Sequence, residues 1–136
     1  MRLTLGSRTY DLTTRAVVVD DSVYATAEDD ASLDRALGAG AILVRMPTPT
    51  VAMLERCAGA GVAVVVPAEA VDMAGAAGLP PDKVVPEALW LDASGRECPV
   101  AVTAVGVIRG ARVVRTTDVR GARRVCDVLA AVLEAR

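Results

Sequence analysis

The residues best suited to chemistry lie near the carboxyl end of the chain, where Arg115, Thr117 and Asp118 follow two valines and precede an amphipathic stretch. Val113 and Val114 predict a short buried strand, and Asp118 is a residue type that opens helices. Ligands of α/β proteins bind where strands end, and the N-terminus of a helix attracts anions. The pattern predicts an anion site at Arg115, Thr117 and Asp118. Without an anion, we expect Arg115 to pair with Asp118 or a neighbouring acid.

Other candidates for catalysis are few, because the sequence contains no histidine. Ser-His-Asp catalysis, Cys-His catalysis and histidine-ligated zinc are therefore excluded. Asp20 and Asp21 offer carboxylates for magnesium, although acids after a strand are also common in turns. The three cysteines lack a Cys-x-x-Cys motif, which favours reduced thiols in the core, and Cys57 has no base nearby in the sequence. We expect no metal and no cofactor.

Composition predicts one globular domain over residues 1–136, since 53% of the residues are hydrophobic. Residues 109–136 are net basic and residues 1–108 net acidic. With one Trp, two Tyr and no Phe, the chain offers no stacking platform for single-stranded nucleic acid. No stretch reaches the ~18 apolar residues of a membrane span, and the first residues do not resemble a signal peptide. We expect a cytoplasmic protein without nucleic-acid or membrane partners.

Strands alternating with helices must position these residues. A hairpin is expected at residues 3–12, and buried strands at 15–19, 41–44, 62–66, 83–85 and 113–115. Helices are expected after a capping box at residues 26–29, after Thr50, over 68–77, over 99–108 and over about 119–134. Residues 89–91 are ambiguous. Such alternation is typical of a parallel sheet, here of about five strands, covered by helices.

Five segments, which follow the order of the family, resemble the dihydropteroate synthase family. Gly110 to Val119 resembles the family's closing Gly-Ala-x-x-x-Arg-x-His-Asp-Val motif. The other segments are residues 3–12, similar to the N-terminal hairpin, 16–19, similar to the first barrel strand, 33–44, similar to the first helix and second strand, and 77–86, similar to the entry to a middle strand. The resemblance implies a partial (β/α)8 TIM-barrel-like parallel sheet with an N-terminal β-hairpin. A flavodoxin-like doubly wound sheet is the alternative that length and alternation also fit.

The resemblance implies an origin in folate biosynthesis, where family members join a pterin diphosphate to p-aminobenzoate. It also implies where the catalytic side chains stand, and four of these positions hold other residues. Asn falls on Val17, the pterin-binding Asp on Val85, a Lys near Asp92 and the His on Thr117. A valine leaves the pterin's paired donors unmatched, at a cost of about 1–3 kcal/mol each. We therefore expect no catalytic residue, with Arg115 and Asp118 the only positions retained.

Three functions follow from these observations. The first is a non-catalytic dihydropteroate synthase-like protein that acts as a partner or regulatory subunit. The second is a small-molecule or phosphate binder with a residual anion site at Arg115, and the third is a weak dihydropteroate synthase.

Partners are expected because a short chain cannot close an eight-stranded barrel and leaves sheet edges uncovered. The resemblance implies dimers through the late helices. We expect a homodimer, or a heteromer with a full-length relative, through residues 99–109 and 119–134, with contacts at Val125, Leu129 and Val132. Trp90 is either a core plug or an interface anchor. The basic cluster of Arg120, Arg123 and Arg124 either docks a partner or forms a solvated face.

Overall fold

The chain begins with the predicted antiparallel hairpin, in a computed structural model that describes residues 1–135. Strands β1 (Arg2–Leu5) and β2 (Arg8–Asp11) pair around Gly6, whose φ of 61° is favourable for glycine. Leu3 and Leu5 alternate with polar residues and are buried. The hairpin therefore presents one apolar face to the rest of the molecule.

The apolar runs form seven short parallel strands within residues 1–135, arranged in two sheets. The order in one sheet is β3-β9-β8, and the order in the other is β4-β5-β6-β7. The strands are β3 (Val17–Val19), β4 (Tyr24–Thr26), β5 (Leu43–Arg45), β6 (Ala63–Val66), β7 (Val84–Pro86), β8 (Trp90–Asp92) and β9 (Val113–Arg115). The ambiguous residues 89–91 thus belong mainly to a strand.

The two sheets close into one ring through the chain itself. β3 leads into β4 through residues 20–23, and β7 leads into β8 through the 3-10 turn η3 (Glu87–Leu89). Each of these two connections joins a strand of one sheet to a strand of the other. The strands can therefore be followed around the ring from β9 through β8, β7, β6, β5, β4 and β3 back to β9. The strands follow the order of a (β/α)8 barrel with segments missing. Within residues 1–135 the predicted single sheet is divided into two, and the chain joins them at these two corners, where β3 does not pair with β4 and β7 does not pair with β8.

Alternate residues along the strands separate into an interior core and two outer cores. The interior core contains Leu43, Val65, Val85 and Val113 together with the hairpin leucines. Their neighbours Val44, Val64, Val84 and Val114 pack outward, beneath the helices. Each strand is therefore apolar on both faces, as the continuous runs predicted.

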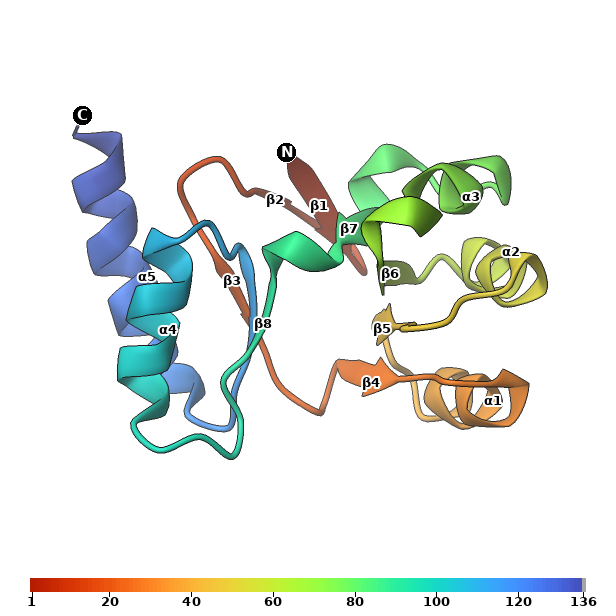
Figure 1. The fold of residues 1–136 in the computed structure, drawn as a ribbon, viewed down its shortest axis with the longest axis horizontal. Coiled ribbons are helices and arrows are strands. Elements are labelled where there is room, and N and C mark those ends of the chain that lie inside the picture. Colours follow the sequence, from red (N-terminus) through yellow and green to blue (C-terminus); the bar gives the residue numbers. More distant parts are fainter. Residues whose placement is uncertain (136) are drawn as a thin grey trace.

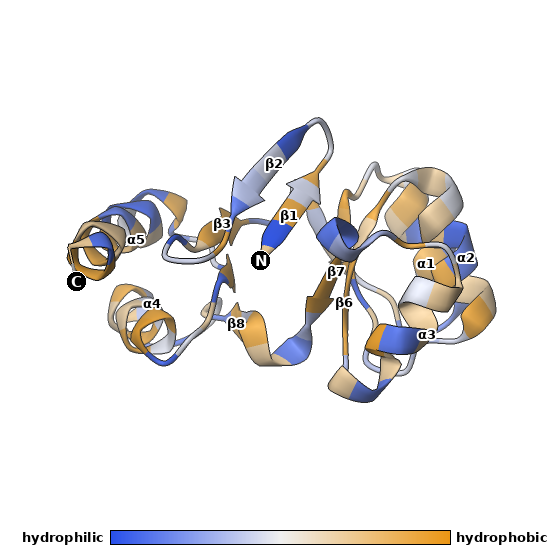
Figure 2. Cartoon of the chain, turned by 90° about the horizontal axis from the view of Figure 1, so that it is seen from above, coloured by the Kyte–Doolittle hydropathy of each residue, from blue (hydrophilic) through white to orange (hydrophobic). Residues whose placement is uncertain are grey.

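The helices cover only the outer faces of the two sheets (Figure 1). On the larger sheet lie α1 (Asp30–Gly38), α2 (Val51–Ala60) and α3 (Val71–Ala76), with the 3-10 turns η1 (Ala68–Ala70) and η2 (Pro81–Lys83). On the smaller sheet lie α4 (Pro99–Ile108) and α5 (Val119–Glu134). Since the other face of each sheet borders the shared interior, the flavodoxin-like alternative is wrong. The hairpin lies across the space between the two sheets (Figure 2).

The helix starts follow the local sequence, with one correction. Thr50 caps α2, where its Oγ1 accepts a hydrogen bond from the amide of Met53. The capping box of α1 is formed by Asp29 and Ser32, three residues later than predicted, because Thr26 ends β4. No described helix combines the length and apolar character needed to cross a membrane.

Candidate functional site

Three neighbouring strand ends bring charged side chains together at one end of the ring. Arg115 is the last residue of β9, Asp92 is the last residue of β8, and Asp21 follows β3. Parallel pairing places Arg115 beside both Val19 and Asp92. The carboxyl ends of the strands therefore converge here, as the sequence predicted for Arg115.

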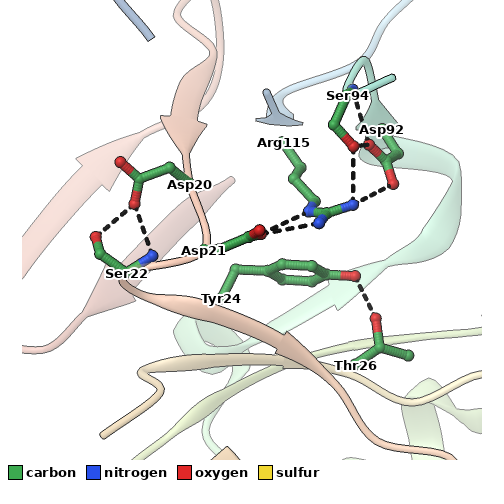
Figure 3. A network of polar contacts seen from close by, with 8 residues as sticks. All are labelled: Asp20, Asp21, Ser22, Tyr24, Thr26, Asp92, Ser94 and Arg115. Atoms are coloured by element: carbon green, nitrogen blue, oxygen red, sulfur yellow. Dashed lines mark hydrogen bonds and ion pairs between the residues drawn. The ribbon is translucent and has the colours of Figure 1, made fainter. Parts of the chain in front are cut away.

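The guanidinium of Arg115 is held by two carboxylates (Figure 3). Its Nε donates to Asp21 Oδ1 at 3.0 Å, and Nη2 lies 2.9 Å from the same oxygen. On the other side, Nη1 donates to Asp92 Oδ2 and to Ser94 Oγ, each at 2.9 Å. Asp92 also accepts hydrogen bonds from the amide and hydroxyl of Ser94, at 2.9 and 2.6 Å. Positive charge at the strand ends is thus matched within the chain.

The pKa values of this network reflect the pairing. Burial alone would lower the pKa of Arg115, but the hydrogen bonds to Asp21 and Asp92 outweigh it and raise that pKa. Burial alone would raise the pKa of Asp92, but the hydrogen bonds from Ser94 and Arg115 bring it below its usual value. Arg115 is therefore a cation, and Asp92 an anion, over the whole physiological range.

Aromatic rings form the floor beneath Arg115. The Arg115 guanidinium carbon lies 5.1 Å from the centroid of the Tyr24 ring, within the range of a cation–π contact. Tyr24 stacks on Trp90 with centroids 4.8 Å apart, and its hydroxyl shares a 2.5 Å hydrogen bond with Thr26 Oγ1. Both rings belong to the interior core, which favours the core-plug interpretation of Trp90.

A second ion pair at the same end was missed by the sequence reasoning. Arg45, the last residue of β5, pairs with Glu87, which follows β7. The Nε of Arg45 is buried and has no hydrogen-bond partner within residues 1–135. Each residue lies at the end of a predicted strand, so its position was available from the sequence. Their pairing was not, because it depends on which strands flank β6.

The other two predicted site residues, Thr117 and Asp118, are not among the hydrogen-bond partners of the Arg115 guanidinium. Thr117 is exposed. Asp118 caps α5, where its Oδ1 accepts a hydrogen bond from the amide of Gly121 at 3.0 Å. The fallback expectation that Arg115 pairs with Asp118 or a neighbouring acid is refined, because its partners are Asp21 and Asp92. The predicted anion site at Arg115, Thr117 and Asp118 stays a prediction.

The remaining candidate residues lie in the core or in a turn, where their contacts account for them without a ligand. Val85 lies within the interior core, and Val17 packs against it. Asp20 accepts hydrogen bonds from the hydroxyl and amide of Ser22, as an acid in a turn does, and these lower its pKa. Burial raises the pKa of the Cys57 thiol to about 11, so it is a poor nucleophile. Within residues 1–135, no group of three or more His, Cys, Asp or Glu side chains is arranged to hold a metal ion.

Comparison with solved structures assigns the fold. The 7,8-dihydropteroate synthase of Vibrio fischeri aligns over 100% of this chain and 99% of its own, with a TM-score of 0.69 and 12% identity. The Yersinia pestis dihydropteroate synthase aligns over 98% of this chain and 99% of its own, with a TM-score of 0.64 and 14% identity. Rv1207 of Mycobacterium tuberculosis aligns over 83% of this chain and 69% of its own, with a TM-score of 0.66 and 20% identity.

At these identities the similarity establishes the fold alone. No protein-family model matches the sequence, and no curated protein matches it significantly. The chain therefore has a dihydropteroate synthase-like fold, in a short form with an N-terminal hairpin and a ring of parallel strands.

Proposed function

We propose that this chain is a non-catalytic protein with a dihydropteroate synthase-like fold, which works as a partner or regulatory subunit. The observation that carries the proposal is the pairing of Arg115 with Asp21 and Asp92. Two carboxylates within hydrogen-bond distance more than balance the charge of one guanidinium. An incoming diphosphate would meet repulsion from these acids at the strand end.

Four positions matched to the family's motifs, one of them Asp92 itself, also support the loss of catalysis. The positions matched to four family side chains, among them an Asn that helps to hold diphosphate and a pterin-binding Asp, carry Val17, Val85, Asp92 and Thr117. Val85 has no exposed surface, so it offers a pterin ring neither an acceptor nor space. Asp92 brings a negative charge near the position matched to a lysine. Catalysis by binding and charge stabilisation needs these groups, because the displacement involves little acid–base work.

The role of a partner is supported by the outer surface of α4 and α5. Exposed apolar side chains gather there, namely Val105, Ile108, Val128 and Val132. A hollow of about 320 Å³ between the two helices is lined by Ala104, Arg124, Val125, Val128 and Leu129. We propose that this surface, which contains the predicted contacts Val125, Leu129 and Val132, joins two copies of the chain or binds a full-length relative.

The three free cysteines are consistent with a reducing compartment, since Cys57 and Cys126 are buried and unpaired. We therefore propose that the protein works in the cytoplasm. No cofactor or metal is part of the proposal.

A turnover assay tests the proposal. Purified protein is incubated with magnesium, a pterin diphosphate and p-aminobenzoate, and the release of diphosphate is measured. A full-length dihydropteroate synthase is the positive control. We expect no turnover above the protein-free background. Turnover that Arg115→Ala abolishes would overturn the proposal and establish a weak synthase.

Phosphate binding at Arg115 is the second candidate function. One observation favours it, which is that the Asp21 side chain is 67% exposed. An anion in solution could therefore replace Asp21 without unfolding the strands. The two candidates are separated by direct titration with diphosphate.

A further inference from the structure

A second hollow of about 350 Å³ lies on the side of the ring, along β3. Its walls are the turn of the hairpin, β3 itself, the loop that follows β3, and the first turns of α5. Neither Arg115 nor Asp92 lines it, so it is separate from the strand-end site. Its volume lies within the range of small-molecule sites, which is roughly 300–1,000 Å³.

The hollow follows the unpaired edge of β3. Val17 and Val19 point into the interior core, and Val18 points into an outer core. All three residues nevertheless line the hollow, so the hollow lies along the edge of the strand and not on one of its faces. The amide of Val17 donates to Arg112 O at 2.8 Å, and Val19 O accepts from the amide of Thr116 at 3.1 Å. The backbone groups of both residues therefore form their hydrogen bonds on the side of β9. Because successive residues of a strand alternate, the N–H and C=O of Val18 are directed toward the hollow.

Positive charge borders the hollow on two sides. Arg8 of the hairpin and Arg123 of α5 both line it, and neither forms an ion pair with any residue of 1–135. The carboxylate in the lining is Asp20, which already accepts two hydrogen bonds from Ser22. Two guanidinium groups against one carboxylate leave an excess of positive charge.

The floor of the hollow is apolar. It is made by side chains from the hairpin, from β3 and from the segments before β4 and β5, namely Leu5, Val17, Val19, Val23 and Ile42. A ligand that pairs with the two arginines and also covers the apolar floor needs an anionic head and an apolar body. Inorganic phosphate has the charge but no body to cover the floor.

We propose that this hollow binds a small organic carboxylate with a short apolar tail. Its carboxylate accepts hydrogen bonds from Arg123, Arg8 and the N–H of Val18, and its tail covers Val19, Val23 and Ile42. The site is separate from the strand-end network, because it shares no residue with Arg115, Asp21, Asp92 or Ser94.

The test is a titration of uniformly 15N-labelled protein with hexanoate, followed by amide chemical shifts. Hexan-1-ol serves as the neutral analogue and inorganic phosphate as the anion without a tail. We expect hexanoate to shift the amides of residues 17–23, most of all that of Val18, and to bind about tenfold or more tightly than either analogue. Arg123→Gln and Arg8→Gln should each weaken hexanoate binding by about tenfold. Arg35→Gln, at an exposed position of α1 outside this lining, should leave it unchanged.

Three results would overturn the proposal. They are the absence of shifts at residues 17–23, equal binding to wild type and Arg123→Gln, and equal binding of phosphate and hexanoate. The amide spectrum of each free variant shows whether it is folded, and the exposed position of both arginines makes folding the expected result. Shifts confined to Arg115 and Asp92 would also overturn it, and would bear instead on phosphate binding at the strand ends.

Discussion

The guanidinium of Arg115 lies 5.1 Å from the centroid of the Tyr24 ring, and the two side chains come from different sheets. Arg115 ends β9 in the smaller sheet, whereas Tyr24 begins β4 in the larger one. Tyr24 also stacks on Trp90 of β8. The contact therefore spans the corner where the chain passes from β3 to β4, at which no strand-to-strand hydrogen bonds join the sheets.

Removal of this link should lower stability. We expect Arg115→Ala to reduce the free energy of unfolding by about 1–2 kcal/mol, because Asp21 and Asp92 lose their shared cation and Tyr24 loses its contact. Urea unfolding followed by circular dichroism measures the change. Arg96→Ala, at an exposed loop position, is the control and should be neutral. Equal stability of wild type and Arg115→Ala would contradict the structural role.

Local features of the fold could be predicted from the sequence. The last helix was expected over about 119–134 and spans Val119–Glu134, because its apolar residues recur with helical spacing. Strand β4 was missed because Thr26 resembles a helix cap. The division into two sheets could not be predicted from the local sequence, because every strand is apolar on both faces and none is marked as an edge strand. The position of Arg115 at the end of a strand could be predicted, but its partners could not, because they lie 94 and 23 residues away in the sequence.

Two glycines in helices should respond oppositely to alanine. A Cβ at Gly121 would lie 2.5 Å from Asp118 Oδ2 and 2.8 Å from Val100 Cγ2, so it would disturb the cap of α5 and its contact with α4. We expect Gly121→Ala to destabilise the protein by about 1–3 kcal/mol. Gly59 in α2 has no atom within 4 Å of such a Cβ, so Gly59→Ala should stabilise by about 0.5–1 kcal/mol. The midpoint of thermal unfolding, measured for both variants and wild type, tests the two predictions. A rise in this midpoint for Gly121→Ala would disprove the packing of α5 on α4.

The lowered pKa of Asp92 predicts an acid dependence of stability. Because the folded-state pKa lies below the usual 3.8, the ionised carboxylate stabilises the fold above that value, and this contribution is lost as the pH falls through the folded-state pKa. Asp92→Asn should therefore lose stability at pH 7 and show a smaller further loss between pH 5 and pH 2. Urea titrations across this range, with exposed Asp72→Asn as control, measure both effects. An unchanged pH dependence in Asp92→Asn would refute the prediction.

The proposed interface predicts self-association through α4 and α5. Wild type should sediment as a dimer at high micromolar concentration, and Leu129→Glu should yield monomer or precipitate. Since Leu129 is partly buried against an outer core, Val128→Glu provides a second variant at a side chain that is 64% exposed. Val51→Glu, at an exposed position of α2, should leave the dimer intact. A well-folded wild-type monomer at this concentration would defeat the interface.

Calorimetric titration with diphosphate and magnesium tests the central claim most directly, namely that the chain's own carboxylates close the strand-end site. Wild type should show no heat of binding. The double variant Asp21→Asn, Asp92→Asn should bind diphosphate, because it frees the Arg115 guanidinium for a new anion. Adding Arg115→Ala to this double variant should abolish the gain. Micromolar binding of diphosphate to wild type, lost in Arg115→Ala, would contradict the account.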